Sequence, residues 1–445
     1  MSNSIPLSPN NPVLLTPSLH VEDARRAIAG LVDELIAQSR IRNNASDIEV
    51  VSLDQAINRI LAEDLLSPID VPAADNSAMD GFAFNGECLG NEDQTITLKI
   101  IGTAYAGRPH IGSVGHGECL KIMTGALMPP DCDTVIPQEF TTHTDSTEGS
   151  LVTFKKNQLA RGENRRLKGE DLQMSKPAIK AGRLLRPSDL GLAASLGIGE
   201  LKVHRKLKVA ILSSGDEIRP LGQKLDAGSI YDSNRYSLTG LLNRLNLEII
   251  DCGIVQDDPA SLKAAFIEAS SKADVLISSG GVSAGEADFT KQIMQELGDV
   301  GFWKIAMRPG RPMAFGVLKP AEESGAKHRV LFFGLPGNPV AVMVTFYQFV
   351  RSALLQLNGA SQTEPLLTQA IAQAPIRKKP GRTEFQRAIM ERGANGQPTV
   401  RITGSQGAGI LRSMSEANCF VILNHEQGSI AAGEWVDVAL FDGLL

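Results

Sequence analysis

The sequence predicts a multidomain α/β plus β protein whose central part is a three-layer αβα domain with a mostly parallel sheet. An elongated N-terminal region that carries an inserted small β domain precedes it, and a C-terminal β domain follows. Length is the first reason, because 445 residues at ~150 residues per domain suggest about three domains. The second reason is that strand-like and helical runs alternate over residues 206–358. The third is that short β-prone runs recur over 71–158 and 359–445.

Five segments follow from these patterns. They are a flexible leader at 1–17, an N-terminal linker domain at 18–70 and 159–205, an inserted β domain at 71–158, the αβα domain at 206–358 and a C-terminal β domain at 359–445. Gly, Pro, Asp and Asn separate the β-prone runs, as turn residues do between short strands. The leader has no basic start followed by an apolar core, so it does not resemble a signal peptide.

The linker domain is predicted to be partly helical. Apolar residues recur at three and four positions over 21–38 and 52–66, which predicts two helices. Ser52 and Gln55 fit a capping box at the start of the second helix. A third helical pattern covers 186–197.

The central domain is the most regular part of the chain. Its strand-like runs are "KVAILSS", "LEIIDCGIV", "DVLISSGG" and "RVLFFGLP", and its helical patterns are "NRYSLTGLLNRL", "PASLKAAFIEASS", "FTKQIMQEL" and "PVAVMVTFYQFVRSALLQL". Strands and helices that alternate in this way favour a parallel sheet with helices on both faces.

Composition excludes several classes of protein. A net charge of -6 argues against binding nucleic acid through the overall field. The five cysteines form no CxxC pair, which argues against a zinc site or a disulfide framework and favours reduced cytoplasmic thiols. The longest apolar run, 339–350, stops at Arg351 and is shorter than the ~18 residues of a membrane span. We therefore expect a cytoplasmic protein without a membrane segment.

Three loops at the predicted carboxyl edge of the sheet carry residues suited to an anion. Open α/β sheets bind ligands outside the carboxyl ends of their strands. Glycine lets a phosphate approach the backbone, and serine hydroxyls add donors. The candidates are Ser213, Ser214, Gly215, Ser278, Ser279, Gly280 and Gly281 after the first and third strands, and Pro336, Gly337, Asn338 and Pro339 after the last.

The last of these loops also suits the start of a helix. Asn338 is a good N-cap and Pro339 a good first residue, so the positive end of the helix dipole would face the loop. A turn that merely connects strand and helix explains these residues equally well. The sequence contains neither a Walker A motif nor G-x-G-x-x-G, so no standard nucleotide motif supports the site.

Carboxylates are concentrated along the same edge. They are Asp216, Glu217, Asp257, Asp258, Glu286 and Asp288. Mg²⁺ prefers oxygen ligands and takes one or two carboxylates together with substrate phosphates, so these acids suit a magnesium site. Helix capping is the alternative for Asp258 and Asp288, because each precedes a helical pattern. Glu217 has no such structural explanation.

Two further stretches have both a structural and a functional interpretation. "KIAMRPGRP" contains Lys304, Arg308 and Arg311, which suit an oxyanion, although a solvated loop explains an isolated cationic stretch better. "PAADNSAMDGFAF" at 72–84 presents Asp80 before Gly81, and its composition alone predicts a turn before a β run.

Taken in order, these stretches resemble the molybdopterin molybdenumtransferase family, which includes the E domain of gephyrin. The resemblance covers nearly the whole chain after the leader. Its motifs are "DNSAMDGFA", "IMTGA", "GED", "SSGDE", "IYDSNR", "DD" at 257–258, "SSGGVSAGEAD", "FWKIAMRPGRP", "GLPGNPV" and "GRTEFQR". So many motifs in one order make the resemblance specific.

The resemblance implies a transferase of molybdenum cofactor biosynthesis. Such an enzyme binds adenylylated molybdopterin, cleaves its phosphoanhydride with Mg²⁺, inserts molybdate at the dithiolene sulfurs and releases AMP. It also implies an elongated homodimer with a site shared between subunits, and contacts with the adenylyltransferase and with cofactor-acceptor proteins. Two alternatives stay open: a molybdopterin adenylyltransferase, whose family resembles the central domain alone, and a non-catalytic dimeric scaffold.

The family motifs also imply roles for individual residues. Asp80 and Thr124 would serve the site of the neighbouring subunit. Catalytic roles fall to Asp80, Thr124, Asp171, Glu217, Asp258 and Asp288, of which the last three would bind metal. Substrate and oxyanion binding falls to the serines, glycines and last-loop residues named above, with Asp216, Lys304, Arg308, Arg311 and Arg387.

The chain departs from the family pattern at two places. Arg308 and Arg311 stand where lysine is common, which keeps the charge but changes the geometry. Ala408 stands where serine is expected, so a hydroxyl contact is missing there and Ala408 is left out of the site.

Overall fold

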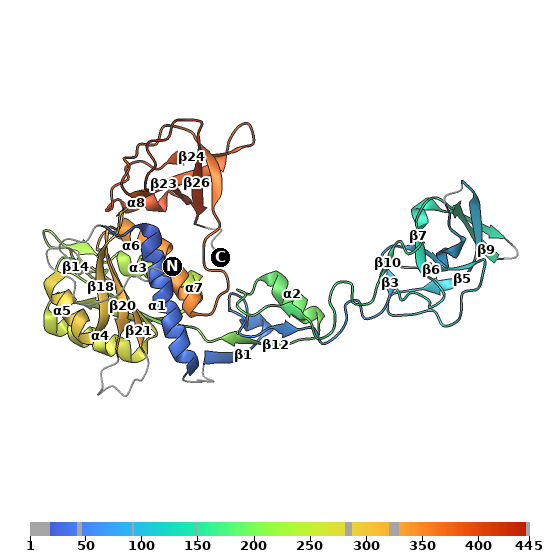
Figure 1. Ribbon diagram of the computed structural model, residues 1–445, viewed down its shortest axis with the longest axis horizontal. Coiled ribbons are helices and arrows are strands. Elements are labelled where there is room, and N and C mark those ends of the chain that lie inside the picture. The colour runs from blue at the N-terminus through green and yellow to red at the C-terminus, as the bar shows by residue number, and fades with distance from the viewer. Residues whose placement is uncertain are drawn as a thin grey trace, which may run out of the picture. The chain divides into compact units, whose positions relative to one another are not determined.

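The computed structural model describes residues 18–41, 47–90, 93–146, 149–280, 287–319 and 329–441 (Figure 1). The chain forms two compact units. The first comprises residues 1–63, 181–187 and 200–445, and the second comprises residues 64–180 and 188–199. Gly281, predicted to bind an anion, and Glu286 lie outside the described residues.

The second unit is built on a six-stranded sheet of order β7-β4-β6-β5-β9-β8. The strands are β4 (Gly81–Phe84), β5 (Thr95–Ala104), β6 (Glu118–Ile122), β7 (Thr134–Pro137), β8 (Thr142–Ser146) and β9 (Gly149–Lys155). Successive residues of β6 point to opposite faces, so Cys119 enters one apolar cluster while Leu120 and Ile122 enter another. Both faces of this small sheet are therefore covered.

Short antiparallel pairs extend the second unit beyond its main sheet. The elements are β2 (Leu65–Leu66), β3 (Asn76–Ser77), β10 (Arg165–Arg166), β11 (Pro177–Ile179) and the helix α2 (Pro187–Ser195), which falls within the helical pattern predicted at 186–197. Strand β10 pairs with β3, and β11 pairs with β2. These pairs bring the "GED" segment alongside the stretch that leads to Asp80.

The helix predicted over 52–66 is wrong. Strand β1 (Ile48–Ser52) pairs instead with β12 (Glu200–His204), and only a 3-10 turn, η2 (Leu53–Gln55), follows. The side chain of Ser52 makes no capping hydrogen bond. Asn58 adopts a φ of 57°, which ends any helix, and its N–H donates to the carbonyl of Leu185. Long-range backbone pairing therefore overrides the local helical pattern.

The central sheet in the first unit has the order β16-β13-β17-β21-β20-β18. The parallel strands are β16 (Glu248–Val255), β13 (Lys208–Ser214), β17 (Val275–Ser279) and β21 (Val330–Leu335). Two antiparallel strands that the sequence analysis missed, β18 (Gly298–Lys304) and β20 (Pro312–Leu318), complete it. A Cβ on Gly316 would lie 2.2 Å from the carbonyl oxygen of Asp299, so this hairpin needs glycine inside a strand.

Helices cover both faces of this sheet, which confirms the three-layer αβα domain. They are α1 (Val21–Ile41), α3 (Asn234–Arg244), α4 (Pro259–Lys272), α5 (Ala287–Leu297), and the continuous segment α6 (Pro339–Thr345), η6 (Phe346–Val350) and α7 (Arg351–Leu357). Alternate residues of β13 face opposite layers: Val209 and Ile211 pack with α1, α3 and α6, whereas Ala210 and Leu212 pack with α4 and α5.

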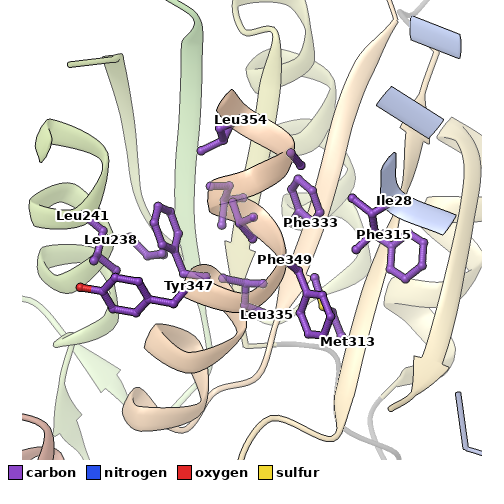
Figure 2. Packing of buried hydrophobic residues seen from close by; sticks show 14 of the residues in the cluster. Ile28, Leu238, Leu241, Met313, Phe315, Phe333, Leu335, Tyr347, Phe349 and Leu354 are labelled. Carbon is purple, nitrogen blue, oxygen red and sulfur yellow. The ribbon is translucent and has the colours of Figure 1, made fainter. Parts of the chain in front are cut away.

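The segment 339–357 is the central apolar helix of the larger cluster, as Figure 2 shows around Phe349 and Phe333. The helical pattern predicted over 339–357 is confirmed, because the helix continues past Arg351 to Leu357. Arg351 is only 7% exposed, and its Nη1 donates to the carbonyl of Thr363. The helix has 19 residues, and an 18-residue window of it has a mean hydropathy of 1.4, enough by length and composition to cross a membrane. However, 78% of that window is buried inside the protein. Such burial is typical of a core helix.

The C-terminal region confirms the predicted β domain and adds one short helix, α8 (Leu411–Ser415). Its strands are β22 (Thr368–Ala372), β23 (Thr383–Arg392), β24 (Pro398–Ile402), β25 (Cys419–Leu423) and β26 (Trp435–Leu440). Because β23 pairs with both β24 and β25, the five strands close into a barrel. A sixth strand, β19 (Met307–Arg308), comes from the central domain and pairs with the start of β23.

Candidate active site

The carboxyl ends of β13 and β17 meet as predicted, but their serines are part of the strands. Ser213 and Ser279 are fully buried, and their hydroxyl oxygens lie 3.2 Å apart. Ser214 and Ser278 are also buried. These four residues therefore form the floor of the predicted cradle, and the half-buried Gly215 and Gly280 follow them.

Gly280 is the point where the strands come closest. Its φ is 92°, and a Cβ at this position would lie 2.2 Å from the carbonyl oxygen of Ser214. Its N–H donates to the carbonyl of Leu335, and a Cβ on Gly337 would lie 3.9 Å from the Cα of Gly280. The structure thus brings together the loops after β13, β17 and β21.

Asn234, at the start of α3, supports this cradle from below. Its Nδ2 donates to the carbonyl of Gly337 at 2.7 Å, and the residue is 7% exposed. Its buried Oδ1 has no hydrogen-bond partner among the residues that the structure describes. Asn234 lies within the motif "IYDSNR", and no role was predicted for it from the sequence. The sequence signal for this role was a side-chain amide in the first turn of a predicted helix, within the motif "IYDSNR".

The start of α6 lies under a loop of the barrel. Pro336 is buried, Gly337 and Asn338 are exposed, and Pro339 is the first helical residue as predicted. Asn338 occupies the N-cap position, but its side chain makes no capping hydrogen bond. The N–H of Val340 donates instead to the carbonyl of Ala408 at 3.1 Å. Ala408 therefore contributes through its backbone, where no hydroxyl is needed.

Asp216 and Glu217 lie exposed on the turn after β13. Arg219 donates to the carbonyl of Asp216 at 2.6 Å, and the N–H of Ile230 donates to that of Glu217 at 2.9 Å. A Cβ on Gly215 would lie 2.8 Å from Oε2 of Glu217, so the carboxylate folds back over this glycine. The turn holds both carboxylates at the edge of the cradle.

Asp258 is the N-cap of α4, which confirms the capping interpretation. Its Oδ1 accepts from the backbone N–H groups of Ala260 at 3.1 Å and Ser261 at 3.0 Å. Hydrogen bonds from the side chain and backbone of Ser261, followed by that from Ala260, lower the pKa of Asp258. By contrast, α5 begins at Ala287, so Asp288 lies inside the first turn and not at its N-cap. The side chain of Asp288 lies outside the described part of the structure.

The predicted cationic stretch forms the loop between β18 and β20. Lys304, Arg308 and Arg311 are all exposed, and within the described residues none forms an ion pair with a carboxylate. A Cβ on Gly310 would lie 2.7 Å from Cγ2 of Thr345 and 3.6 Å from the carbonyl oxygen of Ala341. The loop therefore packs against the first turns of α6.

Arg387 is buried behind this loop, with 1% exposure. Its guanidinium donates to Oγ of Ser413 and to the carbonyls of Ser405, Gln406 and Gly407. Burial, and after it the charge of Arg308, lowers the pKa of Arg387 to about 10. In this structure Arg387 therefore holds the barrel loop and adds positive potential beside Arg308. The expectation that it reaches a ligand directly does not fit this burial.

In the second unit, Asp80 and Thr124, both expected to serve the site, are in direct contact. Oδ1 of Asp80 accepts from both the backbone N–H and the hydroxyl of Thr124, each at 2.7 Å. The backbone bond and then the hydroxyl bond lower the pKa of Asp80. A Cβ on Gly81 would lie 2.0 Å from the carbonyl oxygen of Ile136, so the bend requires glycine. Asp171 is exposed in the same unit, and its N–H donates to the carbonyl of Val71.

Three family descriptions match the chain. They are the MoeA N-terminal region (domains I and II) over residues 19–197, a probable molybdopterin-binding domain over 210–356, and the MoeA C-terminal region (domain IV) over 369–441. Together they cover the second unit, the αβα domain and the barrel. The matches agree with the resemblance read from the motifs.

Known proteins resemble the chain over most of its length. The molybdopterin molybdenumtransferase of Haemophilus influenzae is 42% identical over 398 residues, covering 89% of this chain and 95% of that protein. The enzyme of the same name from a Nostoc species is 32% identical, covering 98% and 97%. A crystal structure of the molybdopterin biosynthesis MoeA protein from Pyrococcus horikoshii superimposes with a TM-score of 0.76 at 28% identity, covering 96% of this chain and 100% of that one. The chain belongs to the molybdopterin molybdenumtransferase family.

Proposed function

We propose that the protein catalyses a late step of molybdenum cofactor biosynthesis, in which molybdate is inserted into adenylylated molybdopterin and AMP is released. The proposal rests on one observation: three loops contact α6. They are the glycine cradle at Gly337, the cationic loop at Gly310 and the barrel loop at Ala408. A phosphoanhydride and an oxyanion both bind where backbone N–H groups can be approached closely and where positive charge is not paired with a carboxylate. The loops around α6 provide both.

The cationic loop suits molybdate. Lys304, Arg308 and Arg311 form no ion pair with a carboxylate in the described residues, so their charge is available to a ligand. Arg387 reinforces the potential from behind, because it too has no carboxylate partner there. Guanidinium groups bind tetrahedral oxyanions through paired N–H donors.

Glu217 and Asp258 suit a magnesium ion that draws most of its ligands from elsewhere. The described residues contain no group of three or more His, Cys, Asp or Glu side chains placed to hold a metal ion. Mg²⁺ commonly takes one or two carboxylates and fills its remaining positions with water and substrate phosphates. When bound, it would neutralise charge on the phosphoanhydride. Glu217 and Asp258 are the described residues that would hold it, with Asp288.

We also propose that the site is completed in a cytoplasmic homodimer, where Asp80, Thr124 and Asp171 of one subunit serve the αβα domain of the other. The support is chemical: two hydrogen bonds fix the direction of the Asp80 carboxylate on an exposed bend, where it is open to a partner. Mixing Asp80→Ala and Glu217→Ala subunits tests this directly. Heterodimers with one intact composite site should restore about a quarter of wild-type activity. If the site lies within one subunit, mixing restores nothing.

The proposed reaction is tested with purified protein, adenylylated molybdopterin, Mg²⁺ and molybdate. Molybdate-dependent release of AMP together with active cofactor is the expected result. ATP-dependent adenylylation of free molybdopterin would identify an adenylyltransferase instead. A folded dimer that releases no AMP under these conditions would contradict the proposal and favour a scaffold. Contacts with the adenylyltransferase and with cofactor-acceptor proteins are further expectations, which pull-down with each purified partner would measure.

A further inference from the structure

Residues Ser18–His20, which precede α1, run as a short strand along the cationic loop. Leu19 forms a parallel bridge with Ile305. The N–H of Leu19 donates to the carbonyl of Lys304, and the N–H of Ala306 donates to that of Leu19, both at 2.8 Å. We call residues 18–20 the N-terminal strap. Its backbone fixes the loop on one side, while Thr383 of the barrel donates to the carbonyl of Ala306 on the other.

The strap also reaches a cationic side chain. Nη2 of Arg311 donates to Oγ of Ser18 at 3.2 Å, across 293 positions of sequence. The carbonyl of Arg311 accepts from the N–H of Ile305, so its backbone is fixed as well. Since Arg311 has no carboxylate partner among the described residues, Ser18 is the neutral acceptor that sets the direction of this guanidinium.

The other end of the strap contacts the barrel. The ring centroids of His20 and His425 lie 4.1 Å apart, with the planes tilted by 31°. The carbonyl of His425 accepts from Nζ of Lys378 and from the N–H of Gly381, so this histidine sits in a well-fixed loop. The strap thus joins α1, the cationic loop and the barrel.

We propose that Ser18 is a positioning residue, which orients Arg311 for the oxyanion substrate. The inference rests on the proposed function. An exposed arginine loses rotamer entropy when it binds a ligand, and a fixed acceptor on one nitrogen removes part of that loss beforehand. A neutral hydroxyl suits this purpose, because a carboxylate at the same place would compete with the incoming anion.

The test compares Ser18→Ala with wild type in steady-state release of AMP, with molybdate varied and the other substrates saturating. We expect the KM for molybdate to rise about three- to tenfold while kcat stays within about twofold. Ser18→Thr keeps the hydroxyl and should restore the wild-type KM. Ser271→Ala is the matched control, because this exposed hydroxyl donates only to the carbonyl of Glu268 within α4.

A second readout separates this inference from the proposed reaction. Calorimetric titration of sodium molybdate into each variant measures affinity without turnover, and thermal melting checks the fold. Weaker binding by Ser18→Ala with an unchanged Tm supports the inference even if wild type releases no AMP. Unchanged binding and KM, in an enzyme whose Arg311→Ala variant binds molybdate poorly, would overturn it. A parallel fall of kcat and Tm would also overturn it, since that pattern marks a merely structural residue.

Discussion

Asp80 in the second unit is exposed and Asp258 in the first is half-buried, but both carboxylates accept hydrogen bonds from backbone N–H groups and both have a lowered pKa. Their partners differ. Asp258 caps its own helix through residues two and three positions away, whereas Asp80 is held by Thr124, 44 positions away. A helix explains Asp258 without any ligand, but no local element explains Asp80. A lowered pKa therefore does not by itself mark a functional carboxylate.

The largest effect should follow from Asp80→Asn. Asn keeps an acceptor for Thr124 but loses the charge, so we expect AMP release to fall by about a hundredfold or more with little change in Tm. Steady-state kinetics and thermal melting measure the two effects. Asp70→Asn is the control, because Asp70 is a half-buried carboxylate of the same unit, held by the N–H of Met174 and paired with Lys168. Equal activity in the two variants would remove Asp80 from the site.

The next test compares Gly280, in the cradle, with Gly222, which has nothing near its Cβ position. Gly280→Ala places a Cβ 2.2 Å from a carbonyl oxygen at a φ of 92°, so we expect a loss of about 3 kcal/mol or more in unfolding free energy. Gly222 has a similar φ of 88° but nothing within 4 Å, so Gly222→Ala should cost only about 1 kcal/mol. Denaturant unfolding measures both. Equal costs would show that close approach at the cradle contributes little.

Asp258→Ser should have an intermediate effect. The serine hydroxyl can still cap α4 but cannot hold Mg²⁺ as a carboxylate does, so we expect activity to fall about tenfold and the Mg²⁺ requirement to rise. Asp258→Ala should lose the cap as well and lower the Tm by about 1–3 °C. Magnesium titrations of AMP release, with melting curves, separate these two roles. Full activity in the serine variant would leave Asp258 a cap alone.

The smallest effect concerns the ionisation of Asp80. Its folded pKa lies below the unfolded value of ~3.9, so it stabilises the protein above that pH, and the contribution is lost as the pH falls through the folded pKa. Thr124→Val removes the hydroxyl donor but keeps the backbone donor, which is the larger cause. The pKa should therefore rise only part of the way to its ordinary value, as titration of the ¹³C carboxyl signal would show. A full return would assign the whole effect to the hydroxyl.

Local pattern predicts much of this fold but fails where pairing is long-range. The alternation over 206–358 identified the four parallel strands because each is rich in β-branched and other apolar residues and is followed by a helical pattern. Strands β18 and β20 were missed because Gly298, Gly301 and Gly316 interrupt the β-prone pattern. The helix expected over 52–66 failed for a related reason, since its backbone groups pair with residues more than 100 positions away. Tertiary context overrides propensity in both cases.

The sequence predicted which residue types form the site, but not which way their side chains point. Sequence placed serines, acids and cations along one edge, yet it could not show that Ser213 and Ser279 are buried or that Arg387 faces the barrel loop. Asn234 and Ser18 were missed because their partners, Gly337 and Arg311, are 103 and 293 positions away. Such contacts leave no periodic signal in the chain.

Strand β19 connects the cationic loop to two domains. Its chain continues into the central sheet, but it pairs by hydrogen bonds with β23 of the barrel. Met307 and Arg308 therefore connect the central domain and the barrel through paired backbone. A label on β23 would therefore lie in the same hydrogen-bonded sheet as Arg308 of the cationic loop.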